Sequence, residues 1–87
     1  MSKILKISHK FYLNYITTKQ CFKYIEADSA QELKDKIVDV ERRTIYTLRI
    51  RKIKEDENKQ IGRIETDFSG ILVGSGELIE RLERYKE

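Results

Sequence analysis

The side chains of this sequence best suited to nucleophilic catalysis are Cys21 and His9, the only cysteine and the only histidine among 87 residues. A cysteine nucleophile needs a base within hydrogen-bond reach. Both residues fall in a predicted hairpin with a three-residue loop, 17–19, which puts His9 opposite Ala27 and Cys21 opposite Tyr15. The two side chains are then six residues apart along the ladder, or ~20 Å at ~3.3 Å per residue. We therefore expect no Cys–His dyad and no enzymatic activity.

Metal ligands are equally scarce in the chain. One histidine and one cysteine cannot complete a tetrahedral zinc site, and Asp56, Glu57 and Asn58 lack the spacing of a calcium loop. Most other acidic residues stand at salt-bridge spacing on predicted helices. The sequence therefore predicts no metal site and no cofactor. Cys21, which shares strand parity with Ile25, is expected to be a small buried hydrophobe.

The segment 70–77, Gly-Ile-Leu-Val-Gly-Ser-Gly-Glu, has the composition of a small anion site. A glycine-rich turn before a helix can direct backbone N–H groups and the positive end of the helix dipole at a phosphate. The segment lacks the endings of the phosphate-binding P-loop and of the dinucleotide-binding GxGxxG motif, and Glu77 adds a negative charge. Gly74, Ser75 and Gly76 therefore form a minor candidate anion or nucleotide site, beside the plainer interpretation of a turn with Ser75 as helix N-cap.

The strongest functional signal is an alternation of apolar side chains with aromatic and cationic ones in the predicted strands. In the first hairpin, one parity carries Leu5, Ile7, Phe11, Leu13, Cys21 and Ile25. Side chains alternate across a strand, so this set builds a core and the other parity faces away from it. With the arginines of the later strands, the outward residues form the predicted partner-binding set: Lys6, Lys10, Tyr12, Phe22, Tyr24, Arg49, Arg51 and Arg63.

These side chains must be positioned by a sheet. Strands are predicted at about 3–16, 20–27, 44–53 and 60–68, and the first two form a hairpin. Ser29 and Glu32 make a capping box for a helix that extends to about Arg42, with apolar residues at positions 30, 33, 37 and 40. A second helix starts near Ser75, with apolar residues at 78, 79, 82 and 85. Opposite charges four residues apart support both helices.

The predicted order is β-β-α-β-β-α. It indicates an α+β fold of one domain, residues 1–87, in which both helices cover one face of an antiparallel four-stranded sheet. The hairpin register that pairs Tyr12 with Tyr24 also pairs Phe11 with Ile25. In the fourth strand, the alternation predicts that Ile64 and Phe68 share one face, with Ile61, Arg63 and Glu65 on the other.

Bulk composition sets the broad class. The net charge of +3 is mildly basic and argues against an acidic nucleic-acid mimic. A single cysteine permits no internal disulfide and fits the cytoplasm, of a bacterium or of a host cell if the gene belongs to a phage. The first residues lack the apolar run of a signal peptide, and no stretch approaches the ~18 apolar residues of a membrane span. The absence of proline and the abundance of Ile, Lys and Glu resemble a low-GC bacterial or phage gene product.

We expect a small non-enzymatic binding or regulatory protein that acts through the open sheet face, such as a phage- or mobile-element-encoded inhibitor of the anti-defence or anti-CRISPR type. Tyr and Arg are favoured interface anchors, and a homodimer would bury more surface than so small a domain can alone. Three alternatives stay open: a single-stranded nucleic-acid-binding protein, on whose rings bases would stack; the anion or nucleotide binder; and plain aromatic packing on a solvated face.

Overall fold

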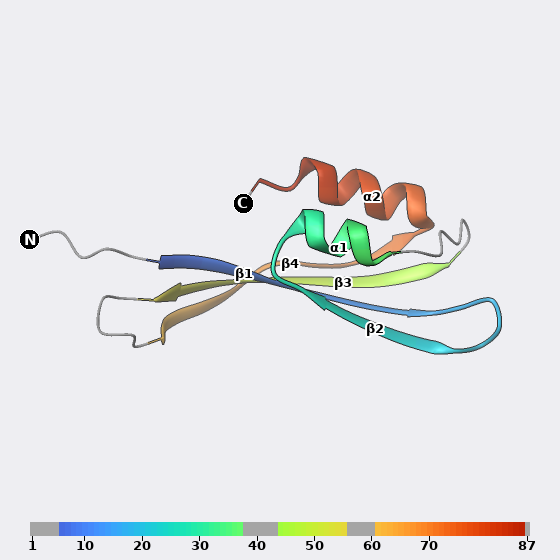
Figure 1. Ribbon diagram of the computed structural model, residues 1–87, viewed down its shortest axis with the longest axis horizontal. Helices are drawn as coiled ribbons and strands as arrows, with labels where there is room; N and C mark the ends of the chain where they lie inside the picture. Colours follow the sequence, from blue (N-terminus) through green and yellow to red (C-terminus); the bar gives the residue numbers. More distant parts are fainter. Residues whose placement is uncertain (1–5, 38–43, 56–60, 87) are drawn as a thin grey trace, which may run out of the picture.

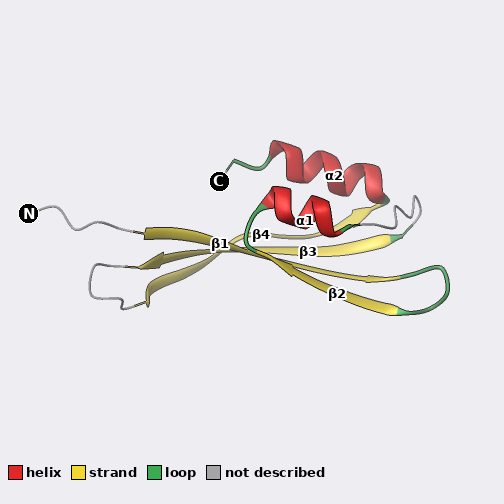
Figure 2. Ribbon diagram, in the orientation of Figure 1, coloured by secondary structure: helices red, strands yellow, loops and turns green. Residues whose placement is uncertain are grey.

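The fold is a four-stranded antiparallel sheet with both helices on one of its faces (Figure 1). A computed structural model of the chain describes residues 6–37, 44–55 and 61–86, except for the side chains of 61–63. The sheet order is β2-β1-β3-β4, and the α+β class and the predicted β-β-α-β-β-α order are confirmed (Figure 2). The elements are β1 (Lys6–Ile16), β2 (Phe22–Ala27), α1 (Ala30–Lys36), β3 (Ile45–Glu55), β4 (Ile61–Val73) and α2 (Ser75–Arg84).

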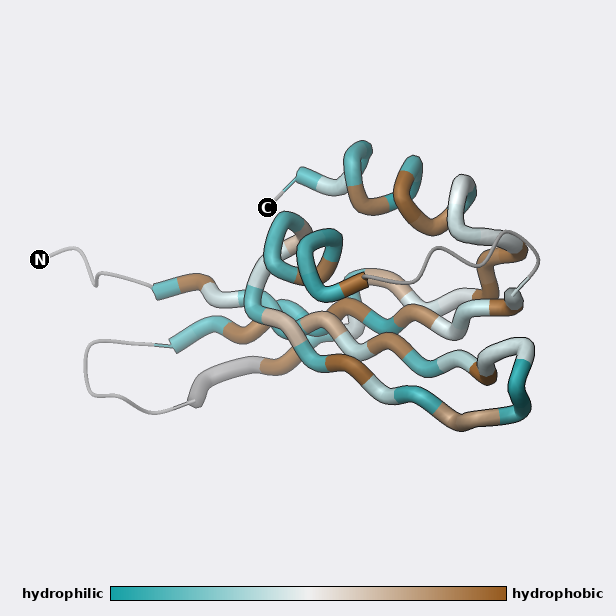
Figure 3. The backbone as a smooth tube through the Cα atoms, turned by 45° about the vertical axis from the view of Figure 1, so that its right-hand side comes forward, coloured by the Kyte–Doolittle hydropathy of each residue, from teal (hydrophilic) through white to brown (hydrophobic). Residues whose placement is uncertain are grey.

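The two-residue period of the strands separates a covered face from an open face. On β3, Tyr46, Leu48 and Ile50 are fully buried under the helices, while Thr47 and Arg49 between them are exposed. The same alternation of hydropathy is visible along the strands in Figure 3. The core between sheet and helices consists of Phe11, Leu13, Tyr15, Ala27, Ala30, Leu33, Ile37, Tyr46, Leu48, Ile50, Leu72, Leu78 and Leu82.

In each helix, a glutamate of the first turn accepts a hydrogen bond from the backbone N–H of the residue before the N-cap. Ser29 caps α1, and its hydroxyl accepts a hydrogen bond from the Glu32 N–H at 3.0 Å. The Glu32 carboxylate in turn accepts from the Asp28 N–H at 2.7 Å, one residue before the cap. This confirms the predicted capping box. The described helix ends at Lys36, earlier than the predicted end near Arg42, which lies outside the described residues.

The second helix starts differently from the prediction. Gly74, rather than Ser75, is the N-cap, with φ 87° and no side-chain cap hydrogen bond. A backbone angle in this region is readily adopted only by glycine. Glu77 repeats the role of Glu32, because its carboxylate accepts from the Val73 N–H at 3.0 Å, so the helix start is held by backbone conformation and by this carboxylate.

The opening hairpin has a longer loop than predicted. Leu13 pairs with Ile25 and Ile16 with Phe22, which leaves residues 17–21 as a five-residue loop. The loop closes when the Cys21 N–H donates to the Thr17 Oγ1 at 3.1 Å, with Gln20 at φ 65°. The predicted register is wrong by two residues, but a shift of two leaves every side chain on its predicted face. Cys21 is exposed in the loop, so the prediction that it is buried is wrong.

The fourth strand is longer than predicted and interrupted by a bulge. It continues to Val73, and Ile50 pairs with Phe68 while Arg51 pairs with Thr66, which leaves Asp67 as the extra residue. An extra residue shifts the following side chains to the opposite face. Phe68 therefore packs against the core whereas Ile64 is exposed, and the prediction that they share a face is wrong.

Candidate functional site

The open face of the sheet carries seven of the eight predicted partner-binding residues. Continuous pairing of β1 with β2 and β3 puts Lys6, Lys10, Tyr12, Phe22, Tyr24, Arg49 and Arg51 at positions that alternate with the buried ones. Arg63 is the exception. Its backbone pairs with Lys54 on β3, but its side chain lies outside the described residues, and its place on the open face stays a prediction.

Four of these residues form a tyrosine–arginine centre: Tyr12, Tyr24, Arg49 and Arg51. The Tyr12 and Tyr24 rings are nearly parallel, with an interplanar angle of 16° and centroids 6.5 Å apart. The Arg51 guanidinium carbon lies 5.8 Å from the Tyr12 ring centroid, within cation–π range. With Asn14 and Thr47, the centre lines a hollow of about 310 Å³. The strands thus present two aromatic faces and two guanidinium groups around one concavity.

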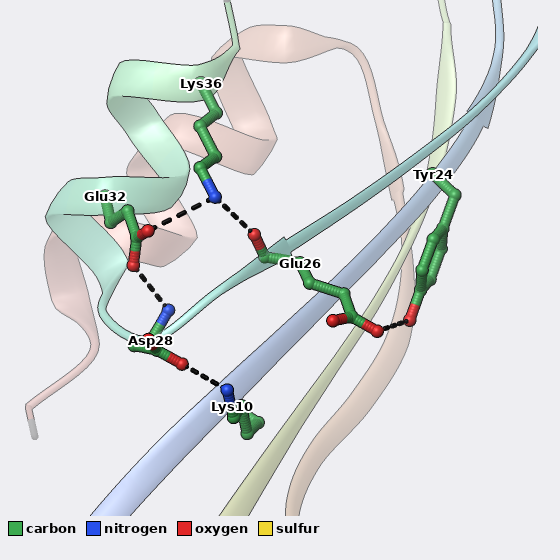
Figure 4. Close-up of polar contacts among 6 residues, drawn as sticks. All are labelled: Lys10, Tyr24, Glu26, Asp28, Glu32 and Lys36. Atoms are coloured by element: carbon green, nitrogen blue, oxygen red, sulfur yellow. Dashed lines mark hydrogen bonds and ion pairs between the residues drawn. The ribbon is translucent and has the colours of Figure 1, made fainter.

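A hydrogen bond within β2 orients the outer tyrosine. The Tyr24 hydroxyl donates to the Glu26 carboxylate at 2.6 Å (Figure 4). This hydrogen bond, with burial and the Glu26 charge as smaller causes, raises the pKa of Tyr24 to about 12. The ring is therefore a neutral phenol at physiological pH, and Glu26 places an acidic group on the same face as the arginines.

A chain of polar contacts connects the open face to α1. Lys10 forms an ion pair with Asp28 at 2.5 Å, and this contact raises the pKa of Lys10 and lowers that of Asp28. The pKa of the Glu32 carboxyl is lowered first by the hydrogen bond that it accepts from the Asp28 N–H. The second cause is Lys36, whose Nζ lies 3.2 Å from the Glu32 Oε1. Lys36 also donates to the Glu26 carbonyl at 2.8 Å (Figure 4). Lys10 therefore has an acidic partner within the chain, in contrast to its predicted role as a cation for a ligand.

The sequence prediction missed an apolar stripe on the same face. It is defined by Ile16, Phe22, Ile45, Ile71 and Val73, whose exposed fractions lie between 58% and 68%. Only Phe22 belonged to the predicted set. The parity rule could have found the others, since Ile16 alternates with Tyr15 and Ile45 with Tyr46, both of which are buried.

Backbone N–H groups of the glycine-rich turn already form hydrogen bonds within the chain. The Gly74 N–H donates to the Thr44 carbonyl at 2.8 Å, and the neighbouring Val73 N–H donates to the Glu77 carboxylate. Ser75 is buried. Two backbone donors near the candidate anion site of Gly74, Ser75 and Gly76 are therefore used internally, and a carboxylate already lies at the helix start.

The remaining candidate groups lie apart. His9 is paired with Lys52 in the sheet and its ring meets the Tyr85 ring edge-on at 5.8 Å, whereas Cys21 lies in the hairpin loop. Within the described residues, no group of three or more His, Cys, Asp or Glu side chains is placed to hold a metal ion. Neither α1 nor α2 has the length and apolar character of a membrane-crossing helix.

Comparisons with known proteins leave the open face as the guide to function. No protein-family model, no curated protein and no solved structure matches this chain.

Proposed function

We propose that this chain is a binding protein that holds a partner protein on the open face of its sheet, with the tyrosine–arginine centre as the anchor. The observation that carries the proposal is the hollow between Tyr12, Tyr24, Arg49 and Arg51 on the face that the helices leave uncovered. Tyr and Arg are the residue types that most often dominate protein-interface energetics, especially where they surround a concavity.

The charges around the hollow indicate the chemistry of the partner. Arg49 and Arg51 line it directly, so a protruding acidic side chain next to an apolar or aromatic one would fit. Glu26 holds the Tyr24 hydroxyl, and Asp28 holds Lys10. Such a mixture of signs is typical of complementary protein surfaces, and it weakens the case for a uniformly anionic polymer. Occupation of a partner's surface is sufficient for a regulator or inhibitor, including one of the phage-encoded type.

The test compares partner capture by three forms of the protein in extract of the native host. Tyr12→Ala combined with Tyr24→Ala should reduce capture of a specific protein by about 10-fold or more, because hot-spot truncations typically cost at least ~2 kcal/mol. Arg84→Ala, which removes an exposed arginine on α2, is the matched control and should capture as the unmodified protein does. The captured protein is then purified and titrated against all three forms.

Circular dichroism spectra keep the comparison interpretable. The double variant should keep the unmodified spectrum, since both tyrosines lie outside the core. Equal affinity of the purified partner for the folded double variant and the unmodified protein would show that the tyrosine–arginine centre is not the anchor.

A second candidate, single-stranded nucleic acid, is favoured by one specific observation: two nearly parallel tyrosine rings beside Arg51. Bases stack on such rings at ~1–3 kcal/mol each. Its test is fluorescence anisotropy with short single-stranded DNA and RNA at low and at physiological salt. Binding that weakens steeply with salt would support this candidate, because phosphate contacts release counterions. Absence of binding at low salt would eliminate it.

A further inference from the structure

The apolar stripe crosses all four strands at the hairpin end of the open face. Ile16 pairs with Phe22 across β1 and β2, and Ile45 pairs with Val73 across β3 and β4. The two pairs adjoin, because Tyr15–Tyr46 is the last pair between β1 and β3 and the next residues on each strand are Ile16 and Ile45. The stripe is therefore one continuous row, at the right-hand end of the sheet in Figure 1.

Part of the row lines a hollow and part of it lies outside that hollow. Ile16, Phe22 and Ile45 line a hollow of about 510 Å³, whose other lining residues are Asn14, Tyr15, Thr17, Thr18, Thr44 and Thr47. Next to it on the edge strand β4, the side chains of Ile71 and Val73 are exposed by 68% and 61% and do not line the hollow; this exposed pair is called the ridge below. In a twofold interface, a surface that contacts its own copy must offer both a feature and its complement. The hollow and the ridge are such a pair.

Charge limits how two copies can meet. The stripe and the lining of its hollow contain no Lys, Arg, Asp or Glu, so two stripes can approach without like-charge repulsion. If the two tyrosine–arginine centres met across the interface, Arg49 and Arg51 of one copy would face the same arginines of the other copy. This contact between like charges costs free energy. The twofold axis must therefore pass through the stripe and direct the two centres away from each other.

The size of the patch also favours a second copy. Five large apolar side chains at this exposure form a patch on the order of 500 Å², at the upper end of what the surface of a monomer shows. The threonines and the asparagine around the hollow enlarge the surface toward the ~800 Å² per partner of a standard stable interface.

We propose that two copies of this chain associate through the apolar stripe, with the Ile71–Val73 ridge of each copy in the Ile16–Phe22–Ile45 hollow of the other. This inference goes beyond the proposed function, because none of the four residues of the tyrosine–arginine centre belongs to the stripe or lines its hollow. A dimer would hold its partner protein at two equivalent sites.

Sedimentation equilibrium of the full chain, from low to high micromolar concentration, tests the proposal. The unmodified protein should sediment with twice the mass of one chain. Ile45→Lys should weaken the association by about 10-fold or more, because it sets two like charges in an apolar interface. Ile71→Thr, which keeps a β-branched side chain suited to a strand, is a second variant whose folding is secure and should also weaken it.

Ile64→Lys is the matched control. Ile64 has a similar exposed fraction, 53%, and pairs with Ile53 toward the opposite end of the sheet, so its replacement should leave the dimer intact. The Tyr12→Ala, Tyr24→Ala double variant should also remain dimeric, which separates this proposal from the proposed function. A monomer at every concentration, a folded Ile45→Lys or Ile71→Thr protein with unchanged association, or dissociation by Ile64→Lys would each overturn the proposal.

Discussion

The covered and open faces of the sheet are built from successive residues of the same strands, yet they have opposite compositions. On β3, buried Tyr46, Leu48 and Ile50 alternate with exposed Ile45, Thr47 and Arg49. The covered residues are those that a core requires. The open residues include isoleucines, tyrosines and arginines whose side chains are exposed or half-buried. The difference separates two tasks: one face stabilises the fold, and the other is available for association.

The largest expected effect is on the covered face. Leu48→Ala should lower the free energy of unfolding by about 2–5 kcal/mol, because Leu48 is fully buried on a central strand and its truncation leaves a cavity. Thr47→Ala, one residue away on the open face, should change it by roughly 0.5 kcal/mol or less. Urea denaturation followed by circular dichroism measures both. Similar losses for the two variants would contradict the division between the faces.

The turn that sets α2 over the covered face should show the next largest effect. Gly74→Ala should destabilise the fold by about 1–3 kcal/mol, because φ 87° with ψ 151° is a region that only glycine adopts readily. Gly76→Ala is the matched change two residues later. A Cβ there meets nothing within 4 Å, and in a helix alanine is favoured over glycine by up to ~1 kcal/mol. Thermal melts should therefore shift in opposite directions for the two variants.

A smaller effect should appear at acid pH where α1 meets the sheet. The pKa values of Asp28 and Glu32 are lowered from their usual 3.8 and 4.5 by their contacts in the fold. Their contribution to stability is therefore present above those usual values and lost as the pH falls through the lowered ones. The free energy of unfolding should fall from pH 6 to pH 3, and less so in the Asp28→Asn, Glu32→Gln double variant. An equal fall in that variant would contradict this origin.

The smallest change concerns one hydroxyl on the open face. Because the hydrogen bond to Glu26 raises the pKa of Tyr24 to about 12, this ring should remain protonated at pH 11, as carbon-13 NMR of the tyrosine rings can follow. Glu26→Gln removes the charged acceptor and should lower the pKa of Tyr24 toward 10. An unchanged titration in that variant would show that the hydrogen bond does not form in solution.

The order of elements and the division into faces could be predicted from the sequence, since both depend on periodicity alone. The hairpin register could not. Its loop contains no glycine and is closed by Thr17 and by a left-handed Gln20, which leave no usual turn signature. The prediction of the open face survived because the error was two residues, a full strand period.

The candidate site was predictable to a similar degree. Tyr12, Tyr24, Arg49 and Arg51 follow from parity, and the structure brings them around one hollow. The face of Ile64 did not follow, because the bulge at Asp67 interrupts the alternation on β4, and an aspartate in a strand is no reliable sign of a bulge. The ridge and hollow of the stripe depend on which strands are neighbours, which the sequence does not state.

The extra residue in β4 has a consequence for how this protein can change. Asp67 accepts a hydrogen bond from the Tyr85 hydroxyl at the end of α2, and substitutions there would disturb a local contact. Loss of the Asp67 codon would remove this contact and make the pairing continuous, but Phe68 would still pair with Ile50 and Thr66 with Arg51, so residues 64–66 would keep their faces. Along β4, a one-residue deletion should therefore be tolerated at Asp67 but selected against between Phe68 and Val73, where it would exchange the faces of the residues on one side of it.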